Sequence, residues 1–595
     1  MFGVLFFLSG ATGLVYQLLW VRLLYQSFGS TIESVTTVVC AFLGGLGLGA
    51  WWLGRHADRH RRPAELYGWL EIGIAICGVG SPYVLDLAHR TYLALMISGQ
   101  VPGAGVALRF GLASLVLLVP TTLMGGTLPA LTRAVTAADR TRLESVLSRF
   151  YAANTLGAML GAATAGFFLI EHAGIRASLW GAAAVNAGLA VAALILARSV
   201  DPIHQPVAAP AQIDLGRVPP WMPRAAFALL VTTAFASLLA EIAWTRVLVL
   251  LVAGSTYAFT LIVTVFLAGL GIGGALVSGP GRSRSRSVAD AALAQGIVAA
   301  GSGLVFLSVT WLPEYLLRVF ADPATGPVER LIWLLVPVGA VVLIPAIGMG
   351  MTFPLLTDLS APPGEARGSD VGRAYAVNTI GSVIGAALTG FVLISAIGTQ
   401  ATLRVGTFLS TGAAIVLILG ASRSLAPEAG RHPLRSRILG AAFLSGIGLS
   451  AALFAPRWDT ARLDLGPAIY GRELRTAADR RGFLRHRGAR QIAFREGRNA
   501  AVSVWDSNVG RGLSINGKAD ASDDVDMETQ VMLGIAPLAA RPTARSALVI
   551  GLGSGVTTRV AADAPTMERV RVVEIEPAVV AMSQFFAHVN DFVLR

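Results

Sequence analysis

The sequence predicts a multi-pass α-helical membrane bundle followed by a small soluble domain, a β-meander joined to an incomplete Rossmann-like α/β unit. Of its 595 residues, 54% are hydrophobic and only 14% are charged, whereas soluble globular proteins carry about 25% charged residues. Apolar runs of spanning length, each able to cross roughly 30 Å of hydrocarbon, fill the chain as far as residue 455. The composition becomes polar only from Pro456 onward.

Thirteen apolar runs are predicted to cross the membrane. Six lie in the first part, at 2–28, 32–54, 66–90, 107–132, 149–171 and 175–198. Six more lie at 222–252, 256–279, 288–312, 329–357, 372–394 and 399–421, and the last lies at 437–455. We expect the first run to be a retained helix rather than a cleaved signal, because no small-residue cleavage site precedes it.

The two sets of six are copies of one another. Matching segments recur at an offset of 224–225 residues, including Trp20-Val21-Arg22 and Trp244-Thr245-Arg246, Gly29-Ser30-Thr31 and Gly254-Ser255-Thr256, Tyr151-Ala152-Ala153-Asn154-Thr155 and Tyr375-Ala376-Val377-Asn378-Thr379. Six is an even number, so both halves insert with the same orientation. Parallel six-helix repeats resemble the major facilitator transporters.

One loop strengthens that resemblance. Gly54-Arg55-His56-Ala57-Asp58-Arg59-His60-Arg61-Arg62 is similar to the Gly-x-x-x-Asp-Arg-x-Gly-Arg-Arg loop of that superfamily and lies at the same place, although it lacks the inner glycine. It is read either as a gating motif or as a plain basic cytoplasmic loop.

The chain is therefore divided into seven predicted segments. These are the first six-helix repeat at 1–200, a linker at 201–221, the second repeat at 222–421, an extra helix at 437–455, an arginine-rich connector at 456–490, a β-meander and helix at 491–540, and the start of a nucleoside-binding α/β unit at 541–595.

Polar residues at membrane depth are rare and mark candidate functional or packing positions. The candidates are Gln17, Arg22, Asn154, Glu241, Arg246 and Asn378. Glu241 and Arg246 are five residues apart, which is about 140° around a helix. We therefore expect them to have partners on other helices, such as Asn154 and Asn378, either as structural contacts or on a substrate or proton path.

The formal net charge is +12, almost all of it from arginine. The arginines cluster between apolar runs, which favours positive-inside loops over a nucleic-acid surface. The predicted partners are the lipid bilayer and a small amine or other small molecule, with no nucleic acid. The predicted location is the inner membrane of a bacterium.

The side of the soluble domain stays open at this stage. A thirteenth crossing puts the domain outside, but the arginine-rich stretch after it and a cytosolic cofactor favour the inside. The two cysteines, Cys40 and Cys77, lie in apolar runs and offer neither a metal motif nor a disulfide framework, so no metal is expected.

The stretch Ala547–Thr557 carries the strongest motif of the soluble domain. A strand runs into Gly551-Leu552-Gly553-Ser554-Gly555, and a second strand ends in Glu574 and Glu576 about twenty residues later. Glycines let the backbone approach a ligand, and an acid after the second strand can accept both hydroxyls of a ribose. The pattern predicts nucleoside binding, with Glu574 favoured over Glu576. The absence of the third glycine of GxGxxG favours S-adenosylmethionine-type ligands over NAD.

The order of these parts resembles the spermidine synthases, the polyamine aminopropyltransferases. The whole chain looks like bacterial membrane proteins that fuse a transporter-like bundle to such a domain. The resemblance implies that decarboxylated S-adenosylmethionine or S-adenosylmethionine binds at Gly551, Gly553, Ser554, Gly555 and Glu574, with Gln530 as a further contact.

The chain also departs from that family. Ser554 replaces an acid, Asp520 replaces a glutamine, and Thr529-Gln530-Val531 stands where the family has Tyr-(His/Gln)-Glu. The family's later strands and its catalytic base do not follow, so we expect a C-terminally truncated sequence in which no catalytic residue can be named.

The resemblance implies aminopropyl transfer to an amine as the function. One alternative is an S-adenosylmethionine-dependent methyltransferase-like membrane protein. A second alternative is a major-facilitator-like transporter with a ligand-sensing soluble domain.

Overall fold

The structure is a computed structural model of the chain. It describes residues 1–28, 32–98, 105–136, 143–198, 218–252, 256–279, 283–322, 325–361, 368–424, 432–474, 476, 482–483 and 489–594. The first Gly-Ser-Thr segment, Gly254 and Ser255 of the second, and most of the predicted linker 201–221 lie outside these residues, as do parts of the basic loops and of the connector.

The first half of the bundle follows the predicted spans. It consists of α1 (Phe2–Phe28), α2 (Ile32–Arg59), α3 (Pro63–Ile97), α4 (Gly105–Thr136), α5 (Leu143–Thr164) and α7 (Gly174–Arg198), with π-helical η2 (Ala165–Leu169) and α6 (Ile170–His172) continuing α5. Several helices are longer than the apolar runs that predict them, because their polar ends extend the helix beyond the stretch that hydrocarbon requires.

The second half repeats the first. It consists of α8 (Met222–Val252), α9 (Thr256–Leu276), α10 (Arg284–Ala321), α11 (Pro327–Ser360), α12 (Gly368–Leu388) and α14 (Thr399–Ser424), with π-helical η3 (Thr389–Leu393) and α13 (Ile394–Ile397) continuing α12. The last long helix is α15 (His432–Phe454). Within the described residues, thirteen helices are long and apolar enough to cross a membrane. The prediction of two parallel six-helix repeats plus a thirteenth helix is confirmed.

Helix packing inside the two halves is equivalent. In the first half α1 packs on α5 and α7, and α2 packs on α4; in the second, α8 packs on α12 and α14, and α9 packs on α11. Glycines make these approaches close. A Cβ on Gly157 would lie 1.8 Å from the Phe7 carbonyl oxygen, and one on Gly381 would lie 2.2 Å from that of Val231. Small residues at such positions let helix backbones meet in lipid.

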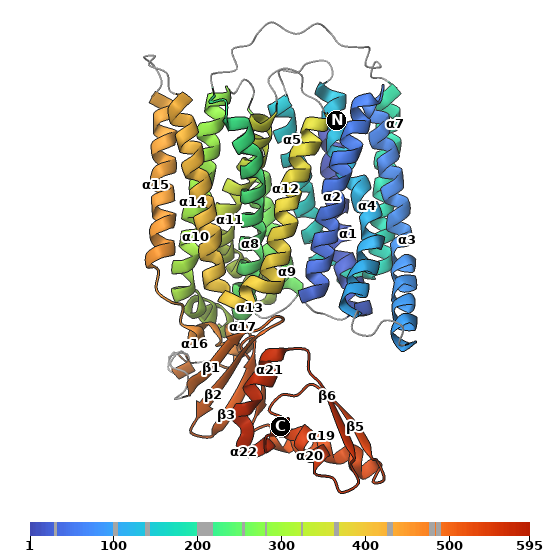
Figure 1. The fold of residues 1–595 in the computed structure, drawn as a ribbon, viewed down its shortest axis with the longest axis vertical. Helices are drawn as coiled ribbons and strands as arrows, with labels where there is room; N and C mark the ends of the chain where they lie inside the picture. Colours follow the sequence, from blue (N-terminus) through green and yellow to red (C-terminus); the bar gives the residue numbers. More distant parts are fainter. Residues whose placement is uncertain are drawn as a thin grey trace, which may run out of the picture.

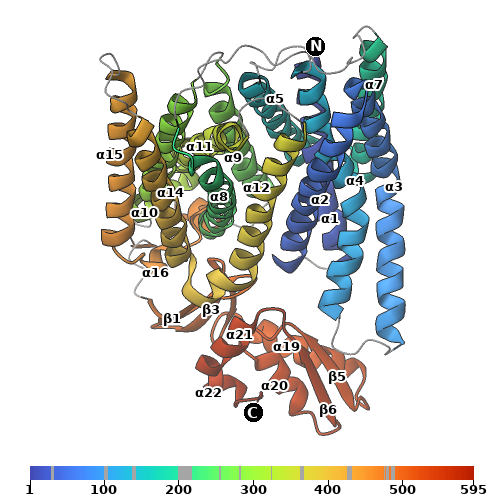
Figure 2. The same ribbon diagram turned by 45° about the horizontal axis from the view of Figure 1, so that its top comes forward.

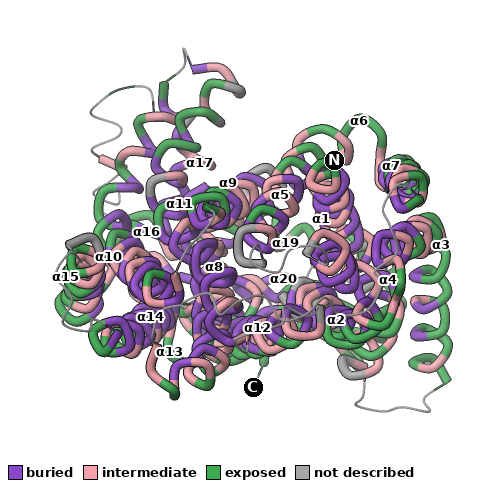
Figure 3. Tube along the Cα trace, turned by 90° about the horizontal axis from the view of Figure 1, so that it is seen from above, coloured by how far each residue is buried: buried purple, intermediate pink, exposed green. Residues whose placement is uncertain are grey.

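Each half has its own hydrophobic core. One pair of buried clusters is built around Trp20 and Tyr67, and another around Trp244 and Leu356. Seen from above, α8 lies in the middle of the bundle, whereas α3 and α15 lie at its periphery with many exposed residues (Figure 3). The exposed leucines, isoleucines and phenylalanines of the peripheral helices are suited to contact with lipid.

The halves meet chiefly through α2 against α12 and α5 against α9. The two π-helical segments take part in this contact. Gly166 of η2 lies against Thr260 of α9, and Gly390 of η3 lies against Thr36 of α2. These four positions are related by the same 224-residue offset, so the contact between the halves is itself duplicated.

The soluble domain begins with short helices α16 (Thr460–Leu463) and α17 (Pro467–Tyr470) and the 3-10 turn η4 (Gly471–Glu473). Asp464, buried at the end of α16, accepts hydrogen bonds from Trp505 Nε1 (2.9 Å), Gly517 N (3.0 Å) and Ser503 Oγ. Burial raises the pKa of the Asp464 carboxyl, and these hydrogen bonds act in the opposite direction. The described part of the connector is therefore ordered against the sheet, which its polar sequence did not predict.

The predicted β-meander is a four-stranded antiparallel sheet. Its strands are β1 (Arg490–Glu496), β2 (Ala501–Ser507), β3 (Gly510–Ile515) and β4 (Lys518–Ser522), in that order. Asn516 and Gly517 both have positive φ, at 50° and 78°, as the predicted tight hairpin turn requires. After α19 (Met527–Ala540) follow β5 (Ser546–Ile550), α20 (Val556–Ala562), β6 (Arg569–Val573), α21 (Pro577–Met582), η6 (Ser583–Phe586) and α22 (Ala587–Asn590), with β5 and β6 parallel.

The soluble domain lies at the end of the bundle opposite to the N-terminus (Figures 1 and 2). The helix α15 crosses the full height of the bundle to reach it. At that end Gln400 Nε2 of α14 donates to the Pro456 carbonyl oxygen (2.7 Å), and Arg404 donates to that of Ala455 (2.9 Å). The start of α14 and the end of α15 are thus joined at the face where the soluble domain begins.

Candidate functional site

The glycine loop connects β5 to α20 and needs its three glycines. Gly551, Gly553 and Gly555 have φ values of 85°, 56° and 89°, a region that side chains with a Cβ rarely adopt. The Gly551 N–H donates to the carbonyl oxygen of Val573 at the end of β6 (2.8 Å). The loop therefore lies beside the end of the second strand, as the sequence predicted.

Glu574, which follows β6, is hydrogen-bonded to the glycine loop. Its Oε2 accepts from the Leu552 N–H (2.8 Å) and its Oε1 accepts from the Glu576 N–H (3.0 Å). The predicted ribose-binding acid is thus next to the glycine loop and is held by two backbone donors. Each carboxylate oxygen can accept a further hydrogen bond, so a role for Glu574 toward a ligand stays a prediction.

Ser554 and Gln530, the other two predicted contacts, bind each other. The buried Ser554 hydroxyl donates to Gln530 Oε1, and Gln530 Nε2 donates to the Ser522 carbonyl oxygen (2.6 Å). Thr557 Oγ1 also donates to the backbone carbonyl oxygen of Gln530 (2.8 Å). The structure therefore brings all the predicted loop residues together, and it uses Ser554 and Gln530 to fasten α19 to the loop.

The sequence favoured Glu574 over Glu576 as the ligand-binding acid, yet Glu576 accepts more hydrogen bonds from the protein. It is 3% exposed and accepts from the N–H groups of Asn499 (2.7 Å), Ala500 (3.1 Å) and Ala578 (3.0 Å). The acid just before Pro577 is a helix N-cap signal, but its bonds to the β1–β2 turn depend on tertiary structure. Glu576 thus links the glycine loop, through Glu574, to the β1–β2 turn.

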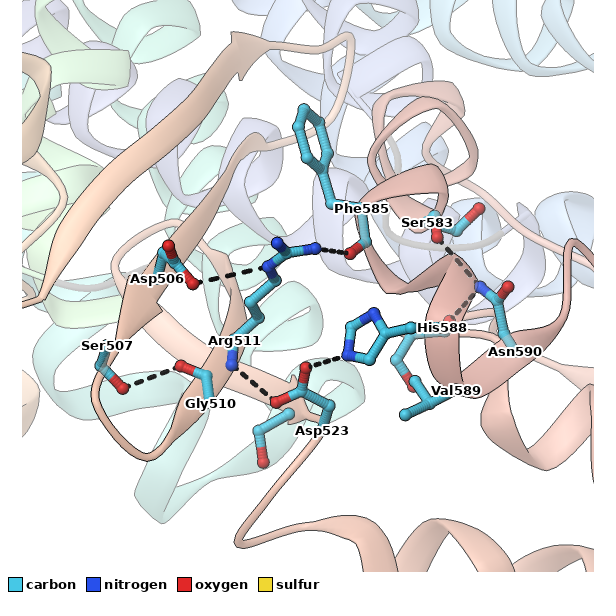
Figure 4. Close-up of polar contacts among 12 residues, drawn as sticks. Asp506, Ser507, Gly510, Arg511, Asp523, Ser583, Phe585, His588, Val589 and Asn590 are labelled. Carbon is cyan, nitrogen blue, oxygen red and sulfur yellow. Dashed lines mark hydrogen bonds and ion pairs between the residues drawn. The ribbon is translucent and has the colours of Figure 1, made fainter.

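The C-terminal η6 and α22 contact the residues around β3 and β4 (Figure 4), and Asn590 also contacts the glycine loop. Arg511 donates from its guanidinium to the Phe585 carbonyl oxygen (2.7 Å), and His588 Nε2 lies 2.6 Å from Asp523 Oδ2. Asn590 Nδ2 donates to the carbonyl oxygens of Ser554 (2.7 Å) and Ser583 (2.9 Å). Asn590 therefore contacts the loop at the Ser554 backbone, whereas Gln530 contacts the Ser554 side chain.

Arg246 connects the membrane bundle to the soluble domain. Its guanidinium donates to the carbonyl oxygens of Asn499 (2.9 Å) and Gly497 in the β1–β2 turn. Its side chain is buried, and the carboxylates of Glu496 and Glu576 act electrostatically on its charge. The expectation that Arg246 has its partner on another helix is wrong: the carbonyls of the turn take up its donors because the sheet packs into the end of α8.

A second contact anchors the domain to α14. The Glu496 side chain accepts from the backbone N–H of Thr399, the first residue of α14, and so caps that helix from outside. An acid at this position also interacts favourably with the helix dipole. Ala501 of β2 belongs to the hydrophobic core of the second half, and Phe494 of β1 packs against it. The sheet is thus an extension of the second half.

The remaining membrane candidates lie in the two halves at equivalent places. Glu241 and Gln17 occupy matching positions in α8 and α1, and both stay partly exposed although their helices lie inside the bundle. In the described part of the chain, no hydrogen-bond or salt-bridge partner contacts the Glu241 carboxylate. Asn378 is likewise partly exposed in α12.

Asn154 is a structural contact between helices. Its Nδ2 donates to the Phe6 carbonyl oxygen of α1 (3.1 Å), not to Glu241 or Arg246. A buried polar cluster that the sequence reading missed lies in the same half. Glu71 of α3 is fully buried and accepts from Ser9 Oγ (2.6 Å) and from the Asn186 side chain. Its only sequence signal is an acid inside an apolar run.

Asp58 of the predicted gating loop joins the two halves. Its Oδ2 accepts from the Ser369 N–H at the start of α12 (2.9 Å), and its Oδ1 lies 3.8 Å from Arg133 Nε of α4. The contact lies at the end of the bundle that carries the N-terminus. An aspartate that bridges both halves can hold that end closed, which a plain surface loop does not do.

No protein-family model and no curated protein matches the chain. Solved structures similar to it include the fucose:proton symporter of E. coli, with 14% identity over 71% of this chain and 97% of that one at a TM-score of 0.43. Others are the nucleoside transporter NupG (15% identity, 71% and 98% covered, TM-score 0.33) and the POT family transporter PepTSo (15%, 77% and 98%, TM-score 0.25).

These comparisons correct the predicted function. The matched structures are described as transporters, which agrees with the transporter alternative and not with aminopropyl transfer, so that prediction is wrong. The local structure agrees with the correction. Ser554, which stands where the resemblance implies an acid, donates its hydroxyl hydrogen to Gln530 Oε1. The described residues form two equivalent halves of six long apolar helices plus a thirteenth, the architecture of a multi-pass membrane protein.

Proposed function

We propose that the protein is a major-facilitator-type transporter of a small molecule, located in the cytoplasmic membrane of a bacterium. The observation that carries the proposal is the symmetric contact between two halves with separate cores. Rigid halves that meet along duplicated, glycine-lined contacts can rock about a central path, which is how parallel-repeat transporters alternate access. Asp58 and Ser369 form a polar closure at one end of that path.

Glu241 is the group on this path that we propose to meet the substrate or a coupling proton. An unpaired carboxylate inside an apolar span is costly, and such residues mark substrate or ion pathways by default. Gln17 at the matching position of the first half is neutral, so this pair of positions carries a carboxylate on one side only. A small amine is one substrate class that this asymmetry suits.

Transport is tested in proteoliposomes that contain the full chain and a panel of labelled amines, sugars, nucleosides and peptides. We expect counterflow of one of these substrate classes. Its rate should fall tenfold or more in Asp58→Asn and by a comparable factor in Glu241→Gln. Gln17→Glu is the matched control that adds a carboxylate in the other half. Failure of every class to exchange would contradict the transporter proposal, and unchanged counterflow in Glu241→Gln would assign Glu241 to packing.

We also propose that the soluble domain binds a nucleoside-type ligand at the glycine loop. The gathering of Gly551, Gly553, Gly555 and Glu574 at one strand end supports it, as do Ser554 and Gln530 fastened behind the loop. Calorimetry of the full chain in detergent with S-adenosylmethionine, its decarboxylated form and methylthioadenosine tests this role. We expect micromolar binding of at least one ligand and its loss in Glu574→Ala, whereas heat-silent titrations with all three would refute it.

A further inference from the structure

The position of the soluble domain relative to the arginines decides a question that the sequence left open. Each of the six loops at the N-terminal end of the bundle carries at least two arginines, within the loop or within six residues of it. They are Arg55, Arg59, Arg61, Arg62, Arg133, Arg140, Arg142, Arg198, Arg217, Arg224, Arg282, Arg284, Arg286, Arg367, Arg373, Arg423, Arg431, Arg435 and Arg437.

The connections at the opposite end are poor in arginine. By the same measure they carry Arg109, Arg176, Arg318, Arg330 and Arg404. The junctions that follow α1 and α8 carry none within that distance. Short loops rich in lysine and arginine stay on the cytoplasmic side during insertion. This asymmetry places the N-terminus and the basic loops in the cytoplasm.

The thirteenth helix then sets the side of the domain. The end of α15 is bonded to the start of α14 through Gln400 and Arg404, at the arginine-poor end. The start of α15 lies at the same end of the bundle as the end of α14 (Figure 1), so α15 crosses the whole bundle. We infer that the soluble domain stands on the non-cytoplasmic side of the membrane, as a cap fixed to the second half of the bundle.

The arginine-rich stretch after α15 and the expected cytosolic cofactor both favoured a cytoplasmic domain, and neither excludes the non-cytoplasmic side. Arg462 and Arg472 of the stretch after α15 lie in α16 and η4, and long domains translocate largely regardless of their charge. The need for a cytosolic cofactor disappears with the aminopropyltransferase function. A ligand of the glycine loop is then one that is present outside the cytoplasm, so methylthioadenosine or another free nucleoside is a better match than a cytosolic methyl donor.

The contacts of the cap are with the second half. Arg246 of α8 donates to the β1–β2 turn, and the N–H of Thr399 in α14 donates to the Glu496 side chain at the end of β1. Trp458 Nε1 donates to the Phe306 carbonyl oxygen of α10 (3.4 Å). These anchors tie the cap to one rocking body. The cap therefore moves with the second half, and opening of the non-cytoplasmic end separates the first half from it.

Cysteine labelling in sealed spheroplasts tests the side of the domain. The full chain carries either Val509→Cys, 73% exposed in the β2–β3 turn, or Arg61→Cys in a basic loop. The chain without an added cysteine is the control, because Cys40 and Cys77 lie within membrane helices. The probe is a membrane-impermeant maleimide.

We expect Val509→Cys to be labelled at least tenfold faster than Arg61→Cys in sealed spheroplasts, and the two rates to converge after lysis. The reverse order, or equal labelling of both in sealed spheroplasts, would overturn the inference. If Val509→Cys reacts poorly even after lysis, Val525→Cys, 81% exposed, replaces it. The result does not depend on transport, so it stands or fails separately from the proposed function.

Discussion

The two halves of the bundle share a fold but not their polar contacts. In the first half, Trp20 Nε1 donates to Ser81 Oγ (3.0 Å). In the second, the equivalent Trp244 Nε1 is buried without a partner among the described residues, because Val305 occupies the position that matches Ser81. The repeat therefore preserves the aromatic core while its hydrogen bonds diverge.

A second pair of positions shows the same divergence. Glu71 in the first half is held by Ser9 and Asn186, whereas the equivalent Gln295 donates to Thr352 Oγ1 (2.8 Å). The second half has instead gained contacts to the soluble domain through Arg246 and Thr399. The comparison teaches that glycines and apolar residues define the repeated fold, while polar side chains adapt each half to its neighbours.

The largest expected effect comes from removing Arg246. Arg246→Ala removes the donor to the carbonyl oxygens of Asn499 and Gly497, together with a buried positive charge that interacts with Glu496 and Glu576. Breaking a buried charged contact costs about 3–5 kcal/mol. We expect a clear fall in the thermal midpoint and rapid tryptic release of the soluble domain.

Arg22→Ala is the matched variant in the first half. Arg22 occupies the equivalent position in α1, where no soluble domain docks in the described structure, so release of the domain should stay at the wild-type rate. Equal release in both variants would mean that Arg246 does not anchor the domain.

An intermediate effect is expected at the two tryptophans. Ser81→Val removes the acceptor of Trp20 and leaves a buried N–H unsatisfied, which costs about 1–3 kcal/mol. Val305→Ser offers Trp244 the missing acceptor, and the gain of about 1 kcal/mol offsets the loss of apolar contact. The midpoint of thermal unfolding should therefore fall for Ser81→Val and change little for Val305→Ser. A larger fall for Val305→Ser than for Ser81→Val would contradict this account of the two sites.

The smallest expected effect concerns the N-terminus of α14, which the Glu496 side chain caps. Gly174 and Gly398 are equivalent, with φ values of 74° and 81°, so alanine at either position carries a similar backbone strain of about 1–3 kcal/mol. Only at Gly398 would the new Cβ meet the domain, 2.9 Å from Glu496 Oε2.

Loss of a helix cap costs about 1 kcal/mol. Gly398→Ala should therefore lower the thermal midpoint slightly more than Gly174→Ala and speed tryptic cleavage at the connector. Indistinguishable variants would mean that Glu496 contributes nothing to holding the domain.

The sequence by itself determined the architecture of the membrane part. Hydrocarbon requires about twenty apolar residues for each crossing, and the 224-residue offset shows the duplication directly. It also located the glycine loop and its acid, because positive φ demands glycine and the strand–loop–helix order is local. These features depend on spacing along the chain, which the sequence displays.

Only the tertiary structure decided which polar groups meet. Arg246 binds a turn some 250 residues away, Glu71 binds two other helices, and Glu576 binds the β1–β2 turn. Hydrogen bonds form between groups that packing brings within about 3 Å, and no local pattern encodes that distance. The side of the soluble domain follows the same rule, since it depended on where the arginine-rich loops and the end of α15 lie in space.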